Sequence, residues 1–257
     1  MQANTHNAQI PPLRLIRTGF PDRAAFGTAV SEALLKRVAA GALPATLRLH
    51  RPARELAFSK QDRSAPGFRA AVGAARAAGF EPVLRLAGGR AAVFTEGTLA
   101  LAWSSPQTRP VEGTGDRFEL FSTIVAGALN GLGVDARVGE VPGEYCPGAW
   151  SVNARGAVKL AGIGQRMIRG AAHLGAVVVA VGSAAVRGAL EPVYAALDLD
   201  WEPRTTGSVE DEVPGAGVDQ VEAALIAELS KSFRLTEAEL DPATLELAAE
   251  LERSHYV

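Results

Sequence analysis

The sequence predicts an α/β (α+β) fold in which mixed, largely antiparallel sheets are flanked by helices. Apolar residues recur every three or four positions over residues 22–40 and 115–132, as they do in amphipathic helices. Short alternating or β-branched runs lie between these segments and are typical of strands. A chain of 257 residues, 47% of them hydrophobic, is long enough to bury a sizeable core. We therefore expect one large mixed domain.

The first half of the chain is expected to alternate between the two element types. After the helix at 22–40, an alanine-rich helix is predicted near residues 68–78. Strands are predicted around it, at residues 45–50, 82–86, 91–94 and 98–103. The helix at 115–132 then ends at Gly133, a residue that commonly terminates helices.

The second half is expected to contain another sheet region and then helices. Short turn-like gaps predict an antiparallel meander of three strands, at residues 158–163, 167–172 and 176–181. A helix near residues 184–197 is expected to close this domain. Residues 1–12 are expected to be a disordered lead-in, 13–204 the main domain and 205–257 a small C-terminal helical extension.

Charge and composition exclude several classes of function. With 26 basic and 28 acidic residues the formal net charge is -2, so no basic field favours nucleic acid. The longest apolar run, residues 176–181, is far shorter than the roughly 20 residues of a membrane-spanning helix, and no signal-peptide core is present. We expect a cytoplasmic monomer that does not bind membranes and acts on a small or carrier-bound substrate.

Cysteine and histidine usage argues against a metal site. The single cysteine, Cys146, excludes an internal disulfide and a cysteine-cluster zinc site. The four histidines have no metal-ligand spacing and are interpreted as surface or turn residues: His6, His50, His173 and His255. Cys146 is therefore either a small buried hydrophobe or a functional thiol.

A glycine pair between two predicted strands is the first candidate site. Gly88 and Gly89 let a ligand approach the backbone closely, and Arg85 and Arg90 place a cation on each side. Exposed amides beside these cations could hold a phosphate, a carboxylate or a carbonyl oxygen. The alternative is an ordinary Gly-Gly hairpin turn with two solvated arginines.

The second candidate site combines a thiol with an isolated lysine. Cys146 lies in a Pro/Gly loop, and Lys159 stands alone among apolar residues of a predicted strand. A buried ammonium needs a carbonyl, phosphate or carboxylate partner. If the two groups converge, the ammonium could favour a thiolate and stabilise the oxyanion formed when the sulfur attacks an acyl carbonyl. Gly162 and Gly164 would leave room for an acyl chain. The alternative reading makes Lys159 an edge-strand surface charge.

Together these segments resemble the lipoate-protein ligase/octanoyltransferase family, which has a biotin/lipoate ligase-like catalytic domain. The resemblance covers residues 13–201. The first family motif is matched by Arg85, Gly88, Gly89, Ala91 and Val93, and the second by Lys159, Ala161 and Gly162. Within the family, the Cys-Pro-Gly loop and the Ala-Gly-Ile-Gly-Gln-Arg continuation look closest to the cysteine-dependent octanoyltransferases.

This resemblance implies an acyltransferase that carries an octanoyl or lipoyl group on a Cys146 thioester, with Lys159 as the second catalytic residue. The partners implied are lipoyl carrier domains, such as the glycine-cleavage H protein and dehydrogenase E2 subunits, or acyl carrier protein. Transfer of this kind requires no cofactor. The residues expected to bind the substrate are Arg85, Gly88, Gly89, Arg90, Ala91, Gly148, Ala161, Gly162 and Gly164.

Two other readings remain open. One is an ATP-dependent lipoate ligase, which would use ATP and Mg and in which Lys159 would contact an acyl adenylate. The other is a catalytically silent binder of lipoyl domains, which would form neither a thioester nor an adenylate. Thr95-Glu96 replaces the His-Asp pair that ligases often have, and Ala157-Val158 precedes the lysine in place of a further basic residue. Both departures argue against adenylate chemistry. We also expect Gly88-Gly89 and Lys159 to face one elongated apolar pocket and to lie within about 15 Å of each other.

Overall fold

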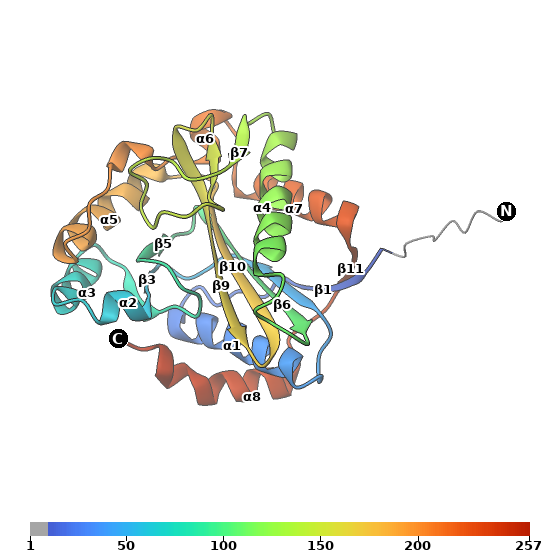
Figure 1. The fold of residues 1–257 in the computed structure, drawn as a ribbon. Coiled ribbons are helices and arrows are strands. Elements are labelled where there is room, and N and C mark those ends of the chain that lie inside the picture. Colours follow the sequence, from blue (N-terminus) through green and yellow to red (C-terminus); the bar gives the residue numbers. More distant parts are fainter. Residues whose placement is uncertain (1–9) are drawn as a thin grey trace.

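Two β-sheets with helices on their outer faces make up the fold in a computed structural model, which describes residues 10–257 (Figure 1). The expected class, mixed and largely antiparallel sheets flanked by helices, is confirmed. The predicted lead-in falls mostly on residues 1–9, which lie outside the described residues. Strand β1 begins at Pro12.

The large sheet has eight strands in the order β11-β1-β2-β6-β10-β9-β8-β7. Strands β11, β1 and β2 run parallel to one another, and the remaining neighbours are antiparallel. The strands, in sheet order, are β11 (Arg234–Glu237), β1 (Pro12–Ile16), β2 (Thr46–His50), β6 (Thr98–Gln107), β10 (Gly170–Val179), β9 (Val158–Ile168), β8 (Val152–Ala154) and β7 (Ala136–Val138).

The small sheet has the order β4-β3-β5 and packs against its own pair of helices. Strand β3 (Glu55–Phe58) is parallel to β4 (Glu81–Leu84) and antiparallel to β5 (Ala92–Phe94). Helices α3 (Phe68–Ala77) and α5 (Ser183–Ala196) cover this sheet and pack on each other. The short helix α2 (Lys60–Arg63) follows β3 and begins with a capping box between Ser59 and Asp62.

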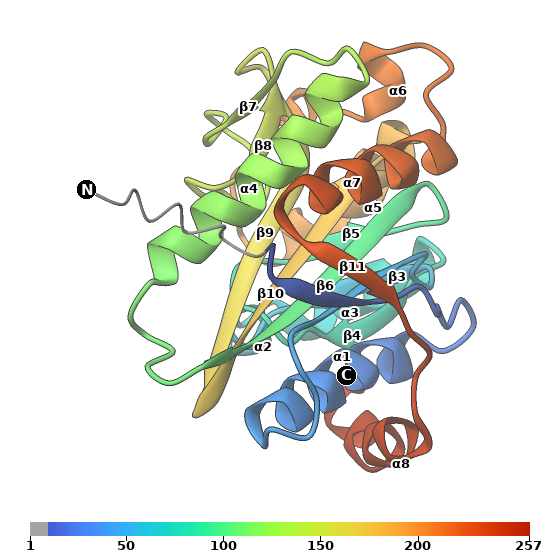
Figure 2. The ribbon, with the colours of Figure 1, turned by 90° about the vertical axis from the view of Figure 1, so that its right-hand side faces the viewer.

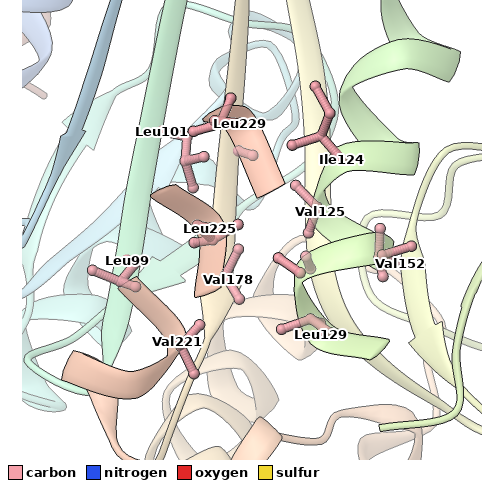
Figure 3. Close-up of a cluster of buried hydrophobic side chains, with 14 of the residues drawn as sticks. Leu99, Leu101, Ile124, Val125, Leu129, Val152, Val178, Val221, Leu225 and Leu229 are labelled. Carbon is pink, nitrogen blue, oxygen red and sulfur yellow. The ribbon is translucent and has the colours of Figure 1, made fainter. Parts of the chain in front are cut away.

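One face of the large sheet is covered by α4 (Thr114–Gly131) and α7 (Val218–Ser232), which pack on each other (Figure 2). Alternate residues of the strands point at these helices, since successive strand residues face opposite sides of a sheet. Figure 3 shows the resulting core, to which Leu99, Leu101 and Val178 contribute from the sheet, Val125 and Leu129 from α4, and Leu225 from α7.

The opposite face of the large sheet is covered by α1 (Ala24–Ala39), behind which α8 (Pro242–Leu251) packs (Figure 2). The small sheet lies beside α1 on this face. Here the strands present small or polar side chains, such as Ala100 and Ala102 of β6, in place of the leucines on the other side. The two faces of the same strands therefore support a core and a cavity.

The predicted three-strand meander is wrong. Residues 158–179 form only two long strands, β9 and β10, which pair along their lengths and turn at Arg169. Gly164 and Gly175 lie in the two gaps between the predicted strands, and they pair with each other across β9 and β10. Glycine occurs in a strand where another part of the chain approaches closely, and the loop that follows β4 lies over Gly164.

Residues 205–257 contribute a strand to the large sheet and helices on both sides of it. Besides α7 and α8 they form α6 (Val209–Glu212) and strand β11, which extends the large sheet beside β1. Short 3₁₀ helices occupy Pro203–Thr205 and Glu252–His255. The expected boundary at residue 204 stays a prediction. Over the described part of the chain, no helix is both long and apolar enough to cross a membrane.

Replacing Leu225 with alanine should lower the free energy of unfolding by about 2–5 kcal/mol, because Leu225 is fully buried between α7, α4 and the sheet. Leu120→Ala is the matched control on α4, where the leucine is 39% exposed. This control should change the free energy by no more than about 0.5 kcal/mol. Urea unfolding of both variants tests the assignment, and equal effects would contradict it.

Candidate functional site

A cavity of about 430 Å³ lies between the large sheet, the small sheet and α1. Its lining is mainly small and apolar, with a few polar groups at either end, as in pockets that bind small apolar ligands. Most of the residues expected to form a site line this one cavity: Arg85, Gly88, Gly89, Cys146, Gly148, Lys159, Gly162 and Gly164.

Lys159 is buried at the base of the cysteine loop and is only 1% exposed. Its ammonium donates to Glu144 Oε1 at 2.9 Å, to the carbonyl of Tyr145 at 3.0 Å and to the carbonyl of Cys146 at 2.8 Å. An ammonium has three hydrogens, so these acceptors use all of them. Lys159 therefore holds the main chain on both sides of the Tyr145-Cys146 peptide bond.

Glu144 compensates the buried ammonium and also organises the loop. Its Oε1 accepts from Ser151 Oγ at 2.5 Å and from the Gly148 amide at 3.2 Å, and its Oε2 accepts from the Val141 amide at 3.1 Å. A buried ion pair is tolerated when its remaining lone pairs are satisfied in this way. The carboxylate thus fixes the loop between β7 and β8 that carries Cys146.

Cys146 is fixed through its backbone and its sulfur. Its amide donates to Tyr194 Oη at 2.9 Å, and that hydroxyl donates to the Ala91 carbonyl at 3.0 Å. The sulfur accepts from the Arg90 amide at 3.1 Å. The backbone of Cys146 is left-handed, with φ of 45°, which is uncommon outside glycine and typical of residues held in place by function. Burial, followed by the nearby cysteine, raises the pKa of Tyr194 well above its ordinary value, so the hydroxyl keeps its proton.

The glycine pair brings a cation next to the thiol. Gly89 has a φ of 109°, and a Cβ there would overlap Arg85 Nη2 and lie 2.8 Å from Cys146 Sγ. Only glycine fits between these two groups. A Cβ at Gly164 would lie 3.1 Å from the Gly88 carbonyl oxygen, so the same loop also packs directly on β9.

Three of the expected substrate-binding residues do not line the cavity. The Arg90 guanidinium faces Asp62 at 3.5 Å, and only its amide reaches the sulfur. Ala91 is buried in the core of the small sheet, where its carbonyl accepts from Tyr194. Ala161 packs into the core beneath α4 and α7, on the opposite face of the large sheet.

Sequence reasoning missed the polar partners of the site. Glu144 stands two residues before the cysteine and was not considered as the partner of Lys159, although a lone buried lysine requires one. The far end of the cavity is lined by Arg48, His50 and Glu55. For Arg48 and His50 the sequence signal lies in β2, where these two residues alternate with leucines over Thr46–His50.

The interpretation of the histidines as surface or turn residues is wrong for three of them. His50, His173 and His255 are 7%, 4% and 4% exposed, and His6 lies outside the described residues. His50 and His173 point at the cavity face of the large sheet, and burial lowers the pKa of both, that of His173 to about 4. Within residues 10–257, no group of three His, Cys, Asp or Glu side chains could hold a metal ion.

Comparison with known proteins shows which family this chain is similar to. Residues 23–230 match the family model described as the lipoyl protein ligase A/B catalytic domain. The chain is 29% identical over 186 residues to an octanoyl-[GcvH]:protein N-octanoyltransferase of Geobacillus kaustophilus, and 30% identical over 159 residues to the protein of that name from Anoxybacillus flavithermus. These matches cover 72% and 62% of this chain but 65% and 57% of the relatives. The chain therefore spans less than two thirds of the length of these curated relatives.

Solved structures share the fold over nearly the whole chain. A putative lipoate protein ligase from T. acidophilum with bound lipoic acid has a TM-score of 0.74 and 20% identity, with 95% of each chain covered. A lipoate-protein ligase A bound with ATP also has a TM-score of 0.74 and 20% identity, with 94% of each chain covered. At this level of identity the likeness shows the fold.

Replacing Lys159 with methionine should destabilise the protein by about 3–5 kcal/mol, because Glu144 would remain buried without its counter-charge. The double variant Lys159→Met/Glu144→Gln should recover part of this loss. Arg109→Met breaks an exposed pair with Glu112 and should cost less than about 1 kcal/mol. Chemical denaturation of the three variants measures these differences, and a Lys159→Met effect as small as the control would refute the buried pair.

His173 should make stability depend on pH between about 6.5 and 4. Its pKa is lowered to about 4 by burial, from an ordinary value of 6.5. In this window the unfolded chain binds a proton that the folded protein does not, so stability falls as the pH falls, by up to about 3 kcal/mol. A His173→Gln variant should show a shallower fall. Unfolding curves at several pH values compare the two proteins, and identical slopes would contradict the assignment.

Proposed function

Because this chain belongs to the lipoyl protein ligase A/B catalytic-domain family, we propose that it transfers a medium-chain acyl group, octanoyl or lipoyl, to the lysine of a carrier protein through a thioester on Cys146. One observation carries the proposal. The thiol of Cys146 lies at the cavity wall against the glycine pair, with the Arg85 guanidinium beside it. A nucleophile, a hydrogen-bond donor that can stabilise negative charge and an apolar cavity therefore occur together.

In the proposed first step the sulfur attacks the carbonyl carbon of an acylated lysine. A C–S bond forms, the C–N bond to the donor lysine breaks, and the thiol proton ends on the leaving nitrogen. In the second step the amine of the acceptor lysine attacks the thioester carbonyl. A C–N bond forms, the C–S bond breaks, and the sulfur regains a proton from the amine. The acyl group passes between existing linkages, so no ATP is consumed.

The residues of the site have separate roles in this proposal. The Arg85 guanidinium lies where it can stabilise the oxyanion of each tetrahedral intermediate. Lys159 and Glu144 act on the chemistry indirectly, by holding the loop in which Cys146 lies. Gly162 and Gly164 leave space for the acyl chain over β9. Arg85 thus takes the role that the sequence alone assigned to Lys159.

The names of the relatives support the choice of partners. The curated relatives are named for transfer from an octanoylated GcvH, and we propose the glycine-cleavage H protein, dehydrogenase E2 subunits or acyl carrier protein as partners of this chain. A solved archaeal relative is described together with its E2 lipoyl domain. The expected cytoplasmic location and monomeric state stay predictions.

Cys146→Ala should abolish transfer from an octanoylated carrier, and Cys146→Ser should form no stable ester, because over residues 10–257 no carboxylate or imidazole is hydrogen-bonded to the sulfur to act as a base for a hydroxyl nucleophile. Incubation of the wild-type protein with octanoylated carrier, without ATP, should give an octanoyl adduct on Cys146 that hydroxylamine removes. Intact-mass analysis measures the adduct, and acyl transfer to a second carrier measures activity.

The same assay includes the arms that would reject the proposal. Wild-type activity in Cys146→Ala would rule out the thioester. Activity that appears only with ATP, Mg and free lipoate would identify a ligase, and binding of lipoyl domains without any acyl product would identify a silent binder. A Pro147→Ala variant is the matched control, since it alters the same loop and keeps the thiol.

A further inference from the structure

Two rows of residues on the floor of the cavity cross four strands of the large sheet, from β2 through β6 and β10 to β9, and the His173 side chain of β10 lies next to Gly175 of the first row. Each row begins with a basic side chain on β2 and ends with a glycine on β9. The first row is Arg48, Ala102, Gly175 and Gly164. The second row is His50, Ala100, Val177 and Gly162. Every one of these residues lines the cavity.

The distance across the floor, from β9 to β2, is close to the length of a medium-chain acyl group. Neighbouring strands lie about 4.8 Å apart, so β2 and β9 are separated by about 14 Å. Cys146 lies at the β9 end, because the loop that contacts its sulfur also packs on Gly164. An extended eight-carbon acyl chain spans about 10 Å, by ordinary single-bond lengths. A chain attached to Cys146 and laid along the floor therefore ends close to β2.

The end of the cavity at β2 is polar and incompletely hydrogen-bonded. The Arg48 side chain donates to the carbonyls of Thr18 and Gly27, both at 2.8 Å, but its Nη2 has no partner among the described residues. The same holds for His50 Nδ1. Over residues 10–257, no hydrogen bond reaches the carboxyl of Glu55, which enters from the small sheet and is 7% exposed. Buried polar groups are nearly always hydrogen-bonded, so Arg48 Nη2 and His50 Nδ1 lack the partner that such atoms normally have.

The protonation states of these three groups favour a polar ligand. Burial raises the pKa of Glu55 to about 8, so at neutral pH the carboxyl keeps its proton and can both donate and accept. Burial, and then the charge of Arg48, lowers the pKa of His50 well below its ordinary value, so the imidazole is neutral. Arg48 keeps its charge at neutral pH, although burial lowers its pKa to about 9. A plain methyl group at this end would satisfy none of them.

We propose that Arg48, His50 and Glu55 form a distal subsite, and that the acyl group this chain prefers carries an oxygen-containing polar group near its far end. The inference rests on the proposed function in one respect, that the acyl chain enters the cavity from Cys146. Among the medium-chain acyl groups that the proposed function covers, it ranks those with a polar terminus above plain octanoyl. Hydrogen bonds to Glu55 and His50 supply the selectivity.

The test compares two neutral amides that imitate an acyl-lysine, N-methyloctanamide and 8-hydroxy-N-methyloctanamide. Calorimetry with the full wild-type chain should show the hydroxylated amide binding about threefold to tenfold more tightly, the range expected for one net hydrogen bond. Glu55→Leu should remove this preference while still binding N-methyloctanamide. Glu55→Gln keeps hydrogen-bonding capacity and should keep the preference, which provides a second variant if Glu55→Leu does not fold.

A matched control lies on the neighbouring strand. Glu81 of β4 pairs with Glu55 across the small sheet but is exposed outside the cavity, so Glu81→Leu should leave the preference unchanged. Equal or weaker binding of the hydroxylated amide by the wild-type protein would overturn the distal subsite and leave the transferase proposal intact. So would an unchanged preference in Glu55→Leu. Binding of neither amide would overturn the subsite and also the assignment of the cavity to an acyl chain.

Discussion

The buried pair formed by Lys159 and Glu144 is the constraint on which the site depends. Two charges removed from water are stable only if each meets its full complement of partners. The ammonium finds three acceptors and the carboxylate four donors, and all but one of the groups involved belong to the loop that carries Cys146. Electrostatic compensation therefore dictates the path of this loop, and the position of the sulfur follows from it.

The cavity arises from the two-sided character of the strands. On one side the strands supply leucines and valines that pack against α4 and α7 and stabilise the fold. On the other side the same strands supply alanine, glycine and a few polar residues, which cannot fill the space beneath α1 and the small sheet. Because side chains alternate along a strand, the residues that stabilise the fold and the residues that line the cavity lie on opposite faces of the sheet. A change on one face can alter the fold without touching the ligand, and the reverse also holds.

Local patterns in the sequence predicted the fold class, the main helices and the convergence of the Gly88-Gly89 turn with Cys146 and Lys159, because periodicity and motif spacing are properties of short segments. They did not predict that β9 and β10 continue through Gly164 and Gly175, since the loop that packs on Gly164 comes from a distant segment and Gly175 pairs with Gly164 only in the sheet. The burial of His50 and His173 was missed for the same reason: α1 and the small sheet cover them only in the folded chain. Glu144 lies only two residues before Cys146, so the need of a buried lysine for a counter-charge identifies it from the sequence.

The backbone amide and carbonyl of Cys146 are hydrogen-bonded to different sheets of the molecule. Its amide is tied through Tyr194 to α5 and the small sheet, and its carbonyl is tied through Lys159 to β9 of the large sheet. Cys146 is therefore anchored to both sheets. A motion that separates the two sheets to admit a larger ligand must also stretch these hydrogen bonds and move the thiol. Under the proposed mechanism, a ligand too bulky for the cavity would therefore move the sulfur away from the acyl carbonyl.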